Sequence, residues 1–432
     1  MDYVASAEAA YELAELIWHY PRSITGAGFN ASLDAIENFI EHPLNRTIFK
    51  SGEVVGDWTI PKQWEVNQAY ILDPEGNRIC DFKENNLHLV GYSSSFKGSL
   101  SKEELNNHLH SLPHLPNAVP YVTSYYKDYW GFCIQDSLRR TLKDGQYEVV
   151  IDSNKFDGEL QIGEYFTPGK ANKSEVLLST YLCHPSMANN ELSGPILAAS
   201  LIKLQKNSYF KRGLRVIFLP ETIGSVAYIS RNLESLKSKV VGGFVLTCVG
   251  DEGQFSLLPS RQETSLSDKA ARFELHRRNI PYKKIPWLER GSDERQFCAP
   301  GVDLPIASLM RTKYGDFVEY HTSMDQLGDV VTVKGITDSL RIYDEILTRM
   351  RNSFIPKSNV LGEPFLTDHN LYPSLSTPLH TKNSFSRSLL DIHSFCDGTN
   401  FIEYIADKVQ LNVPDVLNGL DILKKIEVIF DV

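Results

Sequence analysis

Two kinds of hydrophobic pattern divide the first part of the chain. Apolar residues recur at spacings of three and four over residues 5–18 and again over 32–40, which predicts two amphipathic helices. Between about residues 52 and 135 the apolar runs become short and rich in aromatic side chains, with a strong turn sequence at 74–77. We therefore expect an N-terminal helical segment followed by a smaller β-rich insertion.

From residue 176 onward, unbroken apolar runs of strand length alternate with helical patterns. Such runs are typical of parallel strands that helices cover on both faces. The fold class predicted is therefore α/β, with a mainly parallel mixed sheet and helices on both faces. In sheets of this kind, the residues that bind and react lie on loops at the carboxyl ends of the strands. The predicted strands are 176–182, 215–219, 240–246 and 306–310, and the predicted helices are 194–204, 225–236 and 333–350.

The chain after residue 356 has a different character. Prolines are frequent as far as residue 378, and three short helical patterns and one strand follow, at 388–395, 401–409, 414–423 and 426–430. Three short helices and a strand are typical of a winged-helix module. The domains predicted are an α/β domain formed by 1–55 and 136–356, an inserted β-rich domain at 56–135, and a linker with a winged helix at 357–432.

Composition narrows the classes of partner. The 432 residues carry 44 Lys and Arg against 54 Asp and Glu, a net charge of −10, and residues 386–432 hold four basic and eight acidic side chains. This balance argues against a nucleic acid or an anionic membrane as the partner, since both attract basic surfaces. No apolar run approaches the roughly 20 residues of a membrane span, and the N-terminus lacks the basic region of a signal peptide. Six scattered cysteines without a C-x-x-C pair indicate reduced thiols, so we expect a soluble, cytoplasmic protein.

The first polar cluster, residues 183–194, joins a predicted strand to a predicted helix. It contains His184, Asn190 and Glu191. A neutral imidazole and a carboxylate on one loop are ligands that zinc accepts. A polar loop whose Ser and Asn side chains cap the helix would have the same composition, so this cluster alone leaves both interpretations open.

Two further clusters also follow predicted strands. Glu221 comes directly after the strand at 215–219, where a carboxylate suits a general base or a metal ligand, or is only a helix N-terminal acid. His321 is a second candidate imidazole ligand with Asp325 able to orient it, and Asp293 lies shortly upstream. Two histidines with carboxylates, each near a strand end, favour a metal site over unrelated polar loops.

At these positions the sequence resembles the zinc aminopeptidase family that includes bacterial leucyl aminopeptidases and glutamate carboxypeptidases. The order of the motifs and their loop positions agree over roughly residues 170–330. The chain is more similar still to bacterial aminopeptidase-like proteins found among polysaccharide-biosynthesis genes, which carry an inserted domain and a C-terminal winged helix. The residues that carry the resemblance are His184-Pro-Ser186, Asn190-Glu-Leu-Ser-Gly194, Glu221-Thr-Ile-Gly224, Thr247-Cys-Val-Gly250, Ser292-Asp293 with Phe297, and Tyr320-His-Thr-Ser-Met-Asp325.

The resemblance also brings out a departure. In the family, two zinc ions share a bridging Asp and five protein ligands. Asn190, Thr222 and Thr247 stand where the family has carboxylate ligands, and Ser186 stands where an Asp orients the first His. An amide or a hydroxyl brings no negative charge to offset the dication, so two zinc ions are not expected.

The resemblance therefore implies one zinc ion per chain as the cofactor. By the resemblance, His184, His321 and Glu191 would hold it, and Glu221 stands at the position of the family's general base. Asn190, Asp293 and Asp325 would lie around this site. Tyr320 and Arg311 are predicted substrate contacts, Arg311 for a carboxylate or another anion.

The leading hypothesis is a zinc-dependent amide-bond hydrolase that acts on a peptide or on an amino-acyl or N-acyl sugar. The substitutions at Asn190, Thr222 and Thr247 motivate an alternative, a catalytically degenerate relative that binds a small molecule or serves as a scaffold in polysaccharide biosynthesis. A winged-helix regulator with a sensor domain is a third hypothesis, which the acidic C-terminal module opposes. Exposed short strands leave open a homodimer formed through the inserted domain or the tail.

Overall fold

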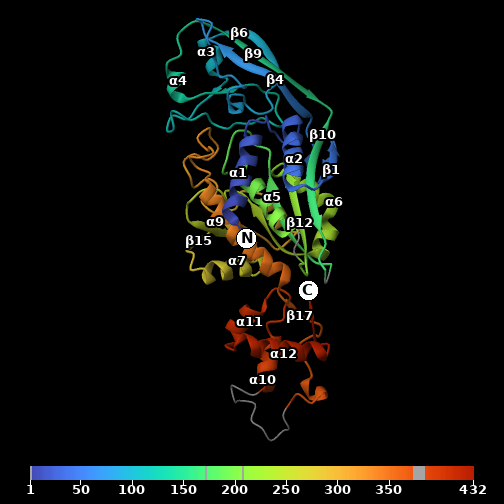
Figure 1. Cartoon of the computed structure of the whole chain (residues 1–432). Coiled ribbons are helices and arrows are strands. Elements are labelled where there is room, and N and C mark those ends of the chain that lie inside the picture. Colours follow the sequence, from blue (N-terminus) through green and yellow to red (C-terminus); the bar gives the residue numbers. More distant parts are fainter. Residues whose placement is uncertain (1, 171–172, 207–208, 373–384) are drawn as a thin grey trace.

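The molecule is built around a large mixed sheet. The structure is a computed structural model that describes residues 2–170, 173–206, 209–372 and 385–432. Within these ranges the sheet has eight strands in the order β1-β10-β12-β11-β13-β16-β14-β15 (Figure 1). They are β1 (Asn45–Lys50), β10 (Glu159–Thr167), β11 (Glu175–Tyr181), β12 (Gly213–Leu219), β13 (Val240–Leu246), β14 (Phe255–Leu258), β15 (Tyr282–Lys284) and β16 (Ile306–Met310).

The centre of this sheet is parallel and its edges are mixed. The neighbours β12, β11, β13 and β16 pair in parallel, whereas β1, β10 and β14 pair antiparallel with their inner neighbours. Every residue of β11 is buried, as expected for a strand covered on both faces. The predicted α/β class with a large mixed sheet is thus confirmed. The strands β1, β9 (Gln146–Phe156) and β10 were not predicted, because polar residues interrupt them and they lack the unbroken apolar run of the central strands.

Helices cover both faces of the sheet. The connection through α5 leads from β11 to its neighbour β12, while the connection through α6 leads from β12 in the opposite direction, past β11 to β13. Right-handed crossovers that run in opposite directions place their helices on opposite faces. The helices α1, α2, α7 and α9 lie on the same face as α5, whereas α8 packs against α6 on the other face. The bounds are α1 (Tyr3–Trp18), α2 (Ala27–Ile40), α5 (Ser193–Gln205), α6 (Ile223–Lys239), α7 (Leu266–Arg277), α8 (Glu294–Phe297) and α9 (Val333–Asn352).

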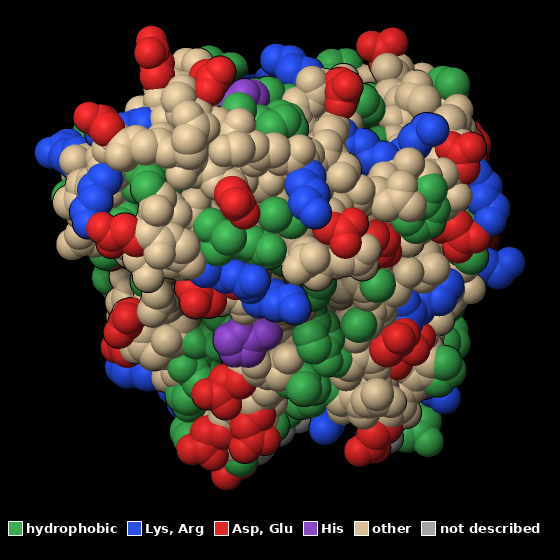
Figure 2. Space-filling model, turned by 90° about the horizontal axis from the view of Figure 1, so that it is seen from above, with side chains coloured by type: hydrophobic (Ala, Val, Ile, Leu, Met, Phe, Trp, Pro, Cys, Tyr) green, Lys and Arg blue, Asp and Glu red, His purple; other side chains and the backbone are tan. Residues whose placement is uncertain are grey.

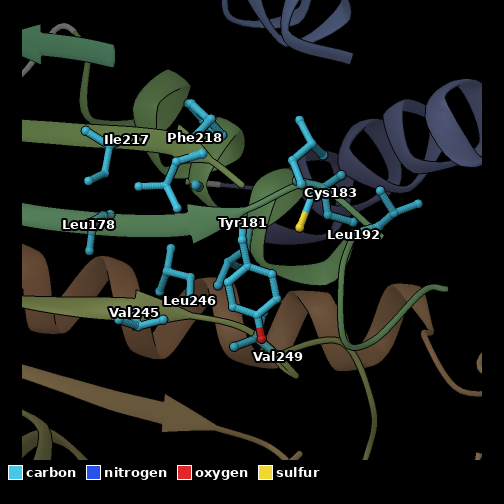
Figure 3. Close-up of a cluster of buried hydrophobic side chains, with 14 of the residues drawn as sticks. Leu178, Tyr181, Cys183, Leu192, Ile217, Phe218, Val245, Leu246 and Val249 are labelled. Carbon is cyan, nitrogen blue, oxygen red and sulfur yellow. The ribbon is translucent and has the colours of Figure 1, made fainter. Parts of the chain in front are cut away.

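The start of α5 crosses very close to the ends of two central strands. A Cβ atom on Gly194 would lie 2.2 Å from the carbonyl oxygen of Leu246 and 2.5 Å from the hydroxyl of Thr180. Only glycine allows this approach, which brings the loop before α5 down onto the ends of β11 and β13. Figure 3 shows the buried side chains at this end of the strands, with Cys183 and Leu192 just beyond β11.

A second, antiparallel sheet lies at the top of Figure 1 and has the order β5-β4-β9-β6. Its longest strands pair Gln63 with Phe156 at one end and Leu72 with Glu148 at the other. Because β9 lies beyond residue 135, this sheet extends past the predicted insertion boundary. Around it lie β2 (Val54–Val55), β3 (Trp58–Thr59), β4 (Gln63–Leu72), β5 (Arg78–Ile79), β6 (Phe96–Ser101), β7 (Leu109–His110), β8 (Phe132–Cys133), η1 (Asn86–His88), α3 (Lys102–Asn106) and α4 (Asp136–Arg140).

The C-terminal part forms a helical module at the bottom of Figure 1. Its own hydrophobic cluster includes Leu389, Leu420 and Leu423. Residues 373–384 of the predicted linker lie outside the described residues. The three predicted helices and the strand are present, and the strand pairs antiparallel with a strand from before the linker. The elements are β17 (Pro356–Ser358), η3 (Leu366–His369), α10 (Phe385–His393), α11 (Ile402–Val409), α12 (Val413–Lys425) and β18 (Ile429–Asp431), and η2 (Trp287–Glu289) lies in the central part.

The surface carries charges of both signs. Figure 2 looks onto the end with the inserted sheet, where acidic and basic side chains are interspersed and no continuous basic field forms. Among the described helices, none combines the length and the apolar character that a membrane span requires.

Candidate active site

The predicted functional loops meet at the carboxyl ends of the central strands. Loops after β11, β12 and β13 contribute His184, Glu221 and Thr247, and a segment after β16 contributes His321. The His184 and His321 rings lie 5.5 Å apart between centroids. Several of these loops are tightly wound, because Ser186, Thr222 and His321 have φ between +51° and +63°, a region that side chains other than glycine rarely occupy. Such backbone strain is often concentrated at functional sites.

Glu191 is fully buried and holds His184 in place. Its Oε2 accepts hydrogen bonds from the backbone N–H of Cys183 at 2.9 Å and of His184 at 3.0 Å. Its Oε1 lies against Nδ1 of His184. Burial, together with the neighbouring His321 and Arg22, lowers the pKa of His184 well below its usual value, so the ring is neutral. With Nδ1 directed to the carboxylate, the lone pair of Nε2 is the one left free.

Nε2 of His184 faces the other candidate groups. It lies 3.7 Å from Oε2 of Glu221. Burial lowers the pKa of His321 to about 4, so this ring is neutral as well. Nδ2 of Asn190 lies 3.4 Å from Nε2 of His321. His184 thus lies close both to the carboxylate of Glu221 and to the ring of His321.

The partly exposed Glu221 and the buried Asp293 form an acidic pair. Burial first, and the neighbouring Asp293 second, raise the pKa of Glu221 above its usual value, while Arg295 acts in the opposite direction. Oδ1 of Asp293 accepts hydrogen bonds from the backbone N–H of Thr222 at 2.7 Å and the hydroxyl of Ser225 at 2.9 Å. Its other carboxylate oxygen is buried without a hydrogen-bond partner among the described residues. Asp293 therefore positions the start of α6 and makes proton retention by Glu221 easier.

The site contains a group of side chains that could hold a metal ion. Cys183, His184 and Glu191 form a buried group whose ligand atoms lie within 4.8 Å of one another. Because Glu191 already accepts two backbone hydrogen bonds and contacts Nδ1, the open donors are Nε2 of His184 and the ring of His321. Neutral imidazoles are the usual nitrogen ligands of zinc.

Protein hydrogen bonds occupy the positions where a second metal would need carboxylates. The hydroxyl of Thr247 accepts a hydrogen bond from Tyr181 at 2.7 Å and donates one to the carbonyl of Asn190 at 2.9 Å. The hydroxyl of Thr222 accepts a hydrogen bond from Arg295 at 2.7 Å. A guanidinium at this place disfavours a cation close to Thr222.

The contacts of two further predicted site residues show what each carboxylate does. Glu191, predicted as a third zinc ligand, belongs with His184 to the buried group of potential metal ligands, and its oxygens contact Nδ1 of His184 and the backbone of the loop. Asp325 was predicted to orient His321, but its carboxylate accepts hydrogen bonds from the backbone N–H of Asn189 at 2.7 Å and Asn190 at 3.1 Å. Burial nevertheless raises the pKa of Asp325 to about 7. Asp325 therefore supports the loop that carries Asn190.

The two residues predicted to contact the substrate, Tyr320 and Arg311, lie in different parts of the structure. Tyr320 stacks on His321 at 3.9 Å between ring centroids and belongs to the site. Arg311 does not, because its guanidinium lies over the ring of Phe255 in a different cleft. The cation that faces the site is Arg295, which lines a cavity of about 220 Å³ together with His184, Glu221 and the aromatic residues Trp58, Tyr125 and Tyr126.

An aromatic residue that was not predicted from the sequence, Tyr121, covers the two histidines. The ring of Tyr121 packs edge-on against His184 at 4.6 Å and against His321 at 5.4 Å. Its backbone N–H donates to the carbonyl of His321 at 2.9 Å, and its hydroxyl lies 2.9 Å from that of Tyr125. The aromatic stretch around Tyr121 was visible in the sequence, but nothing in its pattern connects it with residues some 200 positions away.

Arg22 was also missed. It is almost fully buried and donates a hydrogen bond to the carbonyl of His184 at 2.9 Å. Desolvation lowers the pKa of this arginine to about 10. No local signal marks it, since it follows the first helix in an ordinary Pro-Arg-Ser sequence.

The whole chain has a relative of similar length. A profile of the family described as "Domain of unknown function (DUF4910)" matches residues 11–353. A protein of Clostridium acetobutylicum, named a polysaccharide biosynthesis protein with aminopeptidase-like domain, is 37% identical over 421 residues, which cover 97% of this chain and 95% of that protein.

Solved structures extend the similarity to the fold. A crystal structure from Clostridium acetobutylicum, provisionally described as a peptidase, has a TM-score of 0.82 at 35% identity and covers 100% of this chain and 98% of its own. The zinc aminopeptidase BSAP of Bacillus subtilis has a TM-score of 0.58 at 13% identity, with 80% of this chain and 95% of its own covered. An M28 peptidase precursor from Shewanella amazonensis has a TM-score of 0.57 at 12% identity, with 84% and 97% covered. At such low identity the last two likenesses concern the fold alone.

Proposed function

Because this chain belongs to the DUF4910 family and has the fold of zinc aminopeptidases, we propose that it is an amide-bond hydrolase that uses one zinc ion. The observation that carries the proposal is the convergence of two neutral imidazoles, His184 and His321, with Glu221 at the ends of the central strands. A fold of this kind hosts many activities, so the argument rests on these side chains.

The two imidazoles are the residues that would hold the zinc ion. When bound, zinc polarises a carbonyl group and lowers the pKa of a water molecule. Glu191 fixes the ring of His184 through Nδ1, which keeps Nε2 directed to the open side of the site. Tyr121 covers both rings and excludes bulk water from this side.

Glu221 is the proposed general base. Its carboxylate is 21% exposed and borders the cavity, so it can contact both water and substrate. Its place beside the cavity suits it to take a proton from water, and its raised pKa helps it to hold that proton until it passes to the leaving amine. Asp293 contributes by keeping that pKa raised.

The cavity beside Glu221 suggests the class of substrate. Its wall combines three aromatic side chains with the guanidinium of Arg295, in a volume of about 220 Å³. Aromatic rings accept flat apolar faces, and a guanidinium binds a carboxylate or a phosphate. We therefore place a compact amino-acyl or N-acyl sugar with an acidic group ahead of a long peptide.

Metal content and amide hydrolysis test the proposal together. Protein purified without chelators is expected to contain about one zinc ion per chain, which His184→Ala and His321→Ala both remove. His19→Ala, in an exposed position at the end of α1, is the matched control and should retain the metal. Glu221→Gln should retain zinc but lower kcat on an N-acetylated amino sugar or aminoacyl amide by about 100-fold or more. Metal-free protein that gains no zinc on addition, or a fully active Glu221→Gln variant, would contradict the proposal.

A second candidate, a non-catalytic binding protein, is favoured by one specific observation. Thr222 and Thr247 replace carboxylate ligands, and both hydroxyls are already satisfied by hydrogen bonds within the protein. In that case a ligand would bind to the same cavity, no amide would be cleaved, and Glu221→Gln would change affinity without changing any rate.

A further inference from the structure

A second cleft lies away from the candidate active site. It has a volume of about 560 Å³ and is formed by the loop before β14, the segment after α7 and one side of α9. This volume is in the range of small-molecule sites. Its apolar wall includes Phe255, Ile280 and Ile342. Its charged residues include three arginines, Arg278, Arg311 and Arg341.

The acidic side chains of this cleft already have cationic partners. Glu345 accepts hydrogen bonds from both Arg277 and Arg278. Lys334 lies 2.8 Å from the carboxylate of Asp338 and 3.6 Å from that of Glu252. The negative charge of the cleft is therefore largely compensated by residues other than Arg311 and Arg341.

Arg311 is a buried cation with little compensation. Its side chain is 7% exposed, and its nearest carboxylate oxygen, on Asp338, lies 3.9 Å away. Its Nε is buried without a hydrogen-bond partner among the described residues. The guanidinium carbon lies 4.4 Å from the centroid of the Phe255 ring, which holds the planar group at the wall of the cleft. Desolvation lowers the pKa of this arginine, as expected for a cation that has given up water without a full set of partners.

Arg341 adds a second available charge. It is exposed on α9, and its guanidinium lies 5.7 Å from the ring centroid of Tyr3. Across the parts of the chain that the structure describes, no carboxylate lies within ion-pair distance of it. Arg311 and Arg341 both line the same cleft, next to an apolar wall.

We propose that this cleft binds a small molecule that carries a phosphate or carboxylate group on a compact, largely apolar or ring-shaped body. The anionic group would complete the hydrogen bonding of Arg311 and pair with Arg341. The body would lie against Phe255, Ile280 and Ile342. The site is separate from the cavity beside Glu221, whose own cation is Arg295, and the proposal does not depend on catalysis there.

Isothermal titration calorimetry at constant ionic strength tests this proposal. The probes are glucose 1-phosphate and glucuronate, which share a sugar ring but carry different anions, with inorganic phosphate as the bare group. Saturable binding of at least one probe is expected, and the preferred probe identifies the anion. Arg311→Gln and Arg341→Gln should each weaken that binding about tenfold, since each removes one charge-assisted contact.

The matched control is Arg295→Gln, which removes the cation of the other cavity and should leave the affinity unchanged. Arg311 is buried, so its variant is first checked by circular dichroism. If it does not fold, the exposed Arg341→Gln carries the test. Absence of saturable binding for all three probes would overturn the proposal, and so would binding that depends on Arg295 and not on Arg311 or Arg341.

Discussion

At the scale of single residues, the site shows that a carboxylate from one sequence position can orient a histidine when another position lacks a carboxylate. In the zinc aminopeptidases that the sequence resembles, an Asp orients the first histidine; Ser186 stands at that position here, and Asn190 stands at the position of their bridging Asp. Glu191 reaches back seven residues along the chain to contact Nδ1 of His184. The longer glutamate side chain thus supplies from the end of the loop what a carboxylate two residues after the histidine supplies elsewhere.

Substitution of Glu191 by glutamine is expected to weaken zinc binding. The amide can still accept backbone hydrogen bonds, but it lacks the charge that fixes the ring and raises its basicity, which typically costs about 10-fold to 100-fold in metal affinity. Competition with a chromophoric chelator measures this change. Glu289→Gln, on an exposed turn, is the control, and equal affinity in the two variants would remove Glu191 from the site's function.

At the scale of elements, the site depends on close contacts between segments that are distant in sequence. The loop around Tyr121 pairs with the segment after β16, through a bridge between Pro120 and Thr322 and a hydrogen bond of 2.9 Å from Ser323 to the carbonyl of Val119. The segment between β7 and β8, which carries Tyr121, therefore covers the site directly.

Replacing Tyr121 by alanine is expected to expose both histidines. Loss of the ring removes a contact with each imidazole, so modification by diethylpyrocarbonate should become several-fold faster, while Tyr121→Phe keeps the ring and should behave like the natural protein. Modification followed by mass spectrometry locates the two histidines. Equal rates in all three proteins would show that the ring does not shield them.

Gly194 tests the packing of α5 on the strand ends. In Gly194→Ala the new Cβ would collide with backbone of β13, so the free energy of unfolding should fall by about 2–4 kcal/mol, a loss typical of overpacked core positions. Gly419→Ala is the control, because its Cβ would meet the ends of the Ile392 and Leu389 side chains and no backbone, and the closest of these, the end of Ile392, can move. Urea denaturation measures both, and a loss for Gly194→Ala no larger than that for Gly419→Ala would contradict this interpretation.

At the scale of the whole molecule, a buried arginine connects the central sheet to the C-terminal module. Arg212, whose side chain is fully buried, donates to the carbonyl of Val432 at 2.8 Å and lies 2.8 Å from the carboxylate of Asp431. It also donates to the carbonyls of Met350 and Ser353 at the end of α9. One side chain thus connects the first residues of β12, the last turn of α9 and the final strand.

Removal of this arginine is expected to loosen the C-terminal module. Arg212→Ala leaves several buried acceptors unpaired, so a loss of about 3–5 kcal/mol is expected, together with an earlier, separate unfolding transition in calorimetry. The control is Arg231→Ala, which breaks a largely exposed pair with Glu53 and should cost at most about 1 kcal/mol. A single unchanged transition for Arg212→Ala would show that the module is held by other contacts.

The α/β class, the four central strands, the helices that follow them and the loops that carry His184, Glu221 and His321 could be predicted from the sequence. These features are local, because a buried parallel strand needs an unbroken apolar run and a strand end is where a polar loop begins. The sequence also indicated that a second metal lacks its carboxylates, since residue type alone decides that. The edge strand β1, and β9 of the second sheet, escaped prediction because polar residues interrupt their apolar runs.

Only the tertiary structure decided which side chains face one another. In the structure, Glu191 contacts Nδ1 of His184, Asp325 accepts hydrogen bonds from the backbone of its neighbours, and Arg311 lies in a separate cleft. Tyr121, Arg22 and Arg295, which were not predicted, lie at the site. The physical reason is that burial, hydrogen-bond geometry and long-range packing depend on the path of the whole chain. A side chain's role follows from the neighbours that this path provides, and no spacing in the sequence records them.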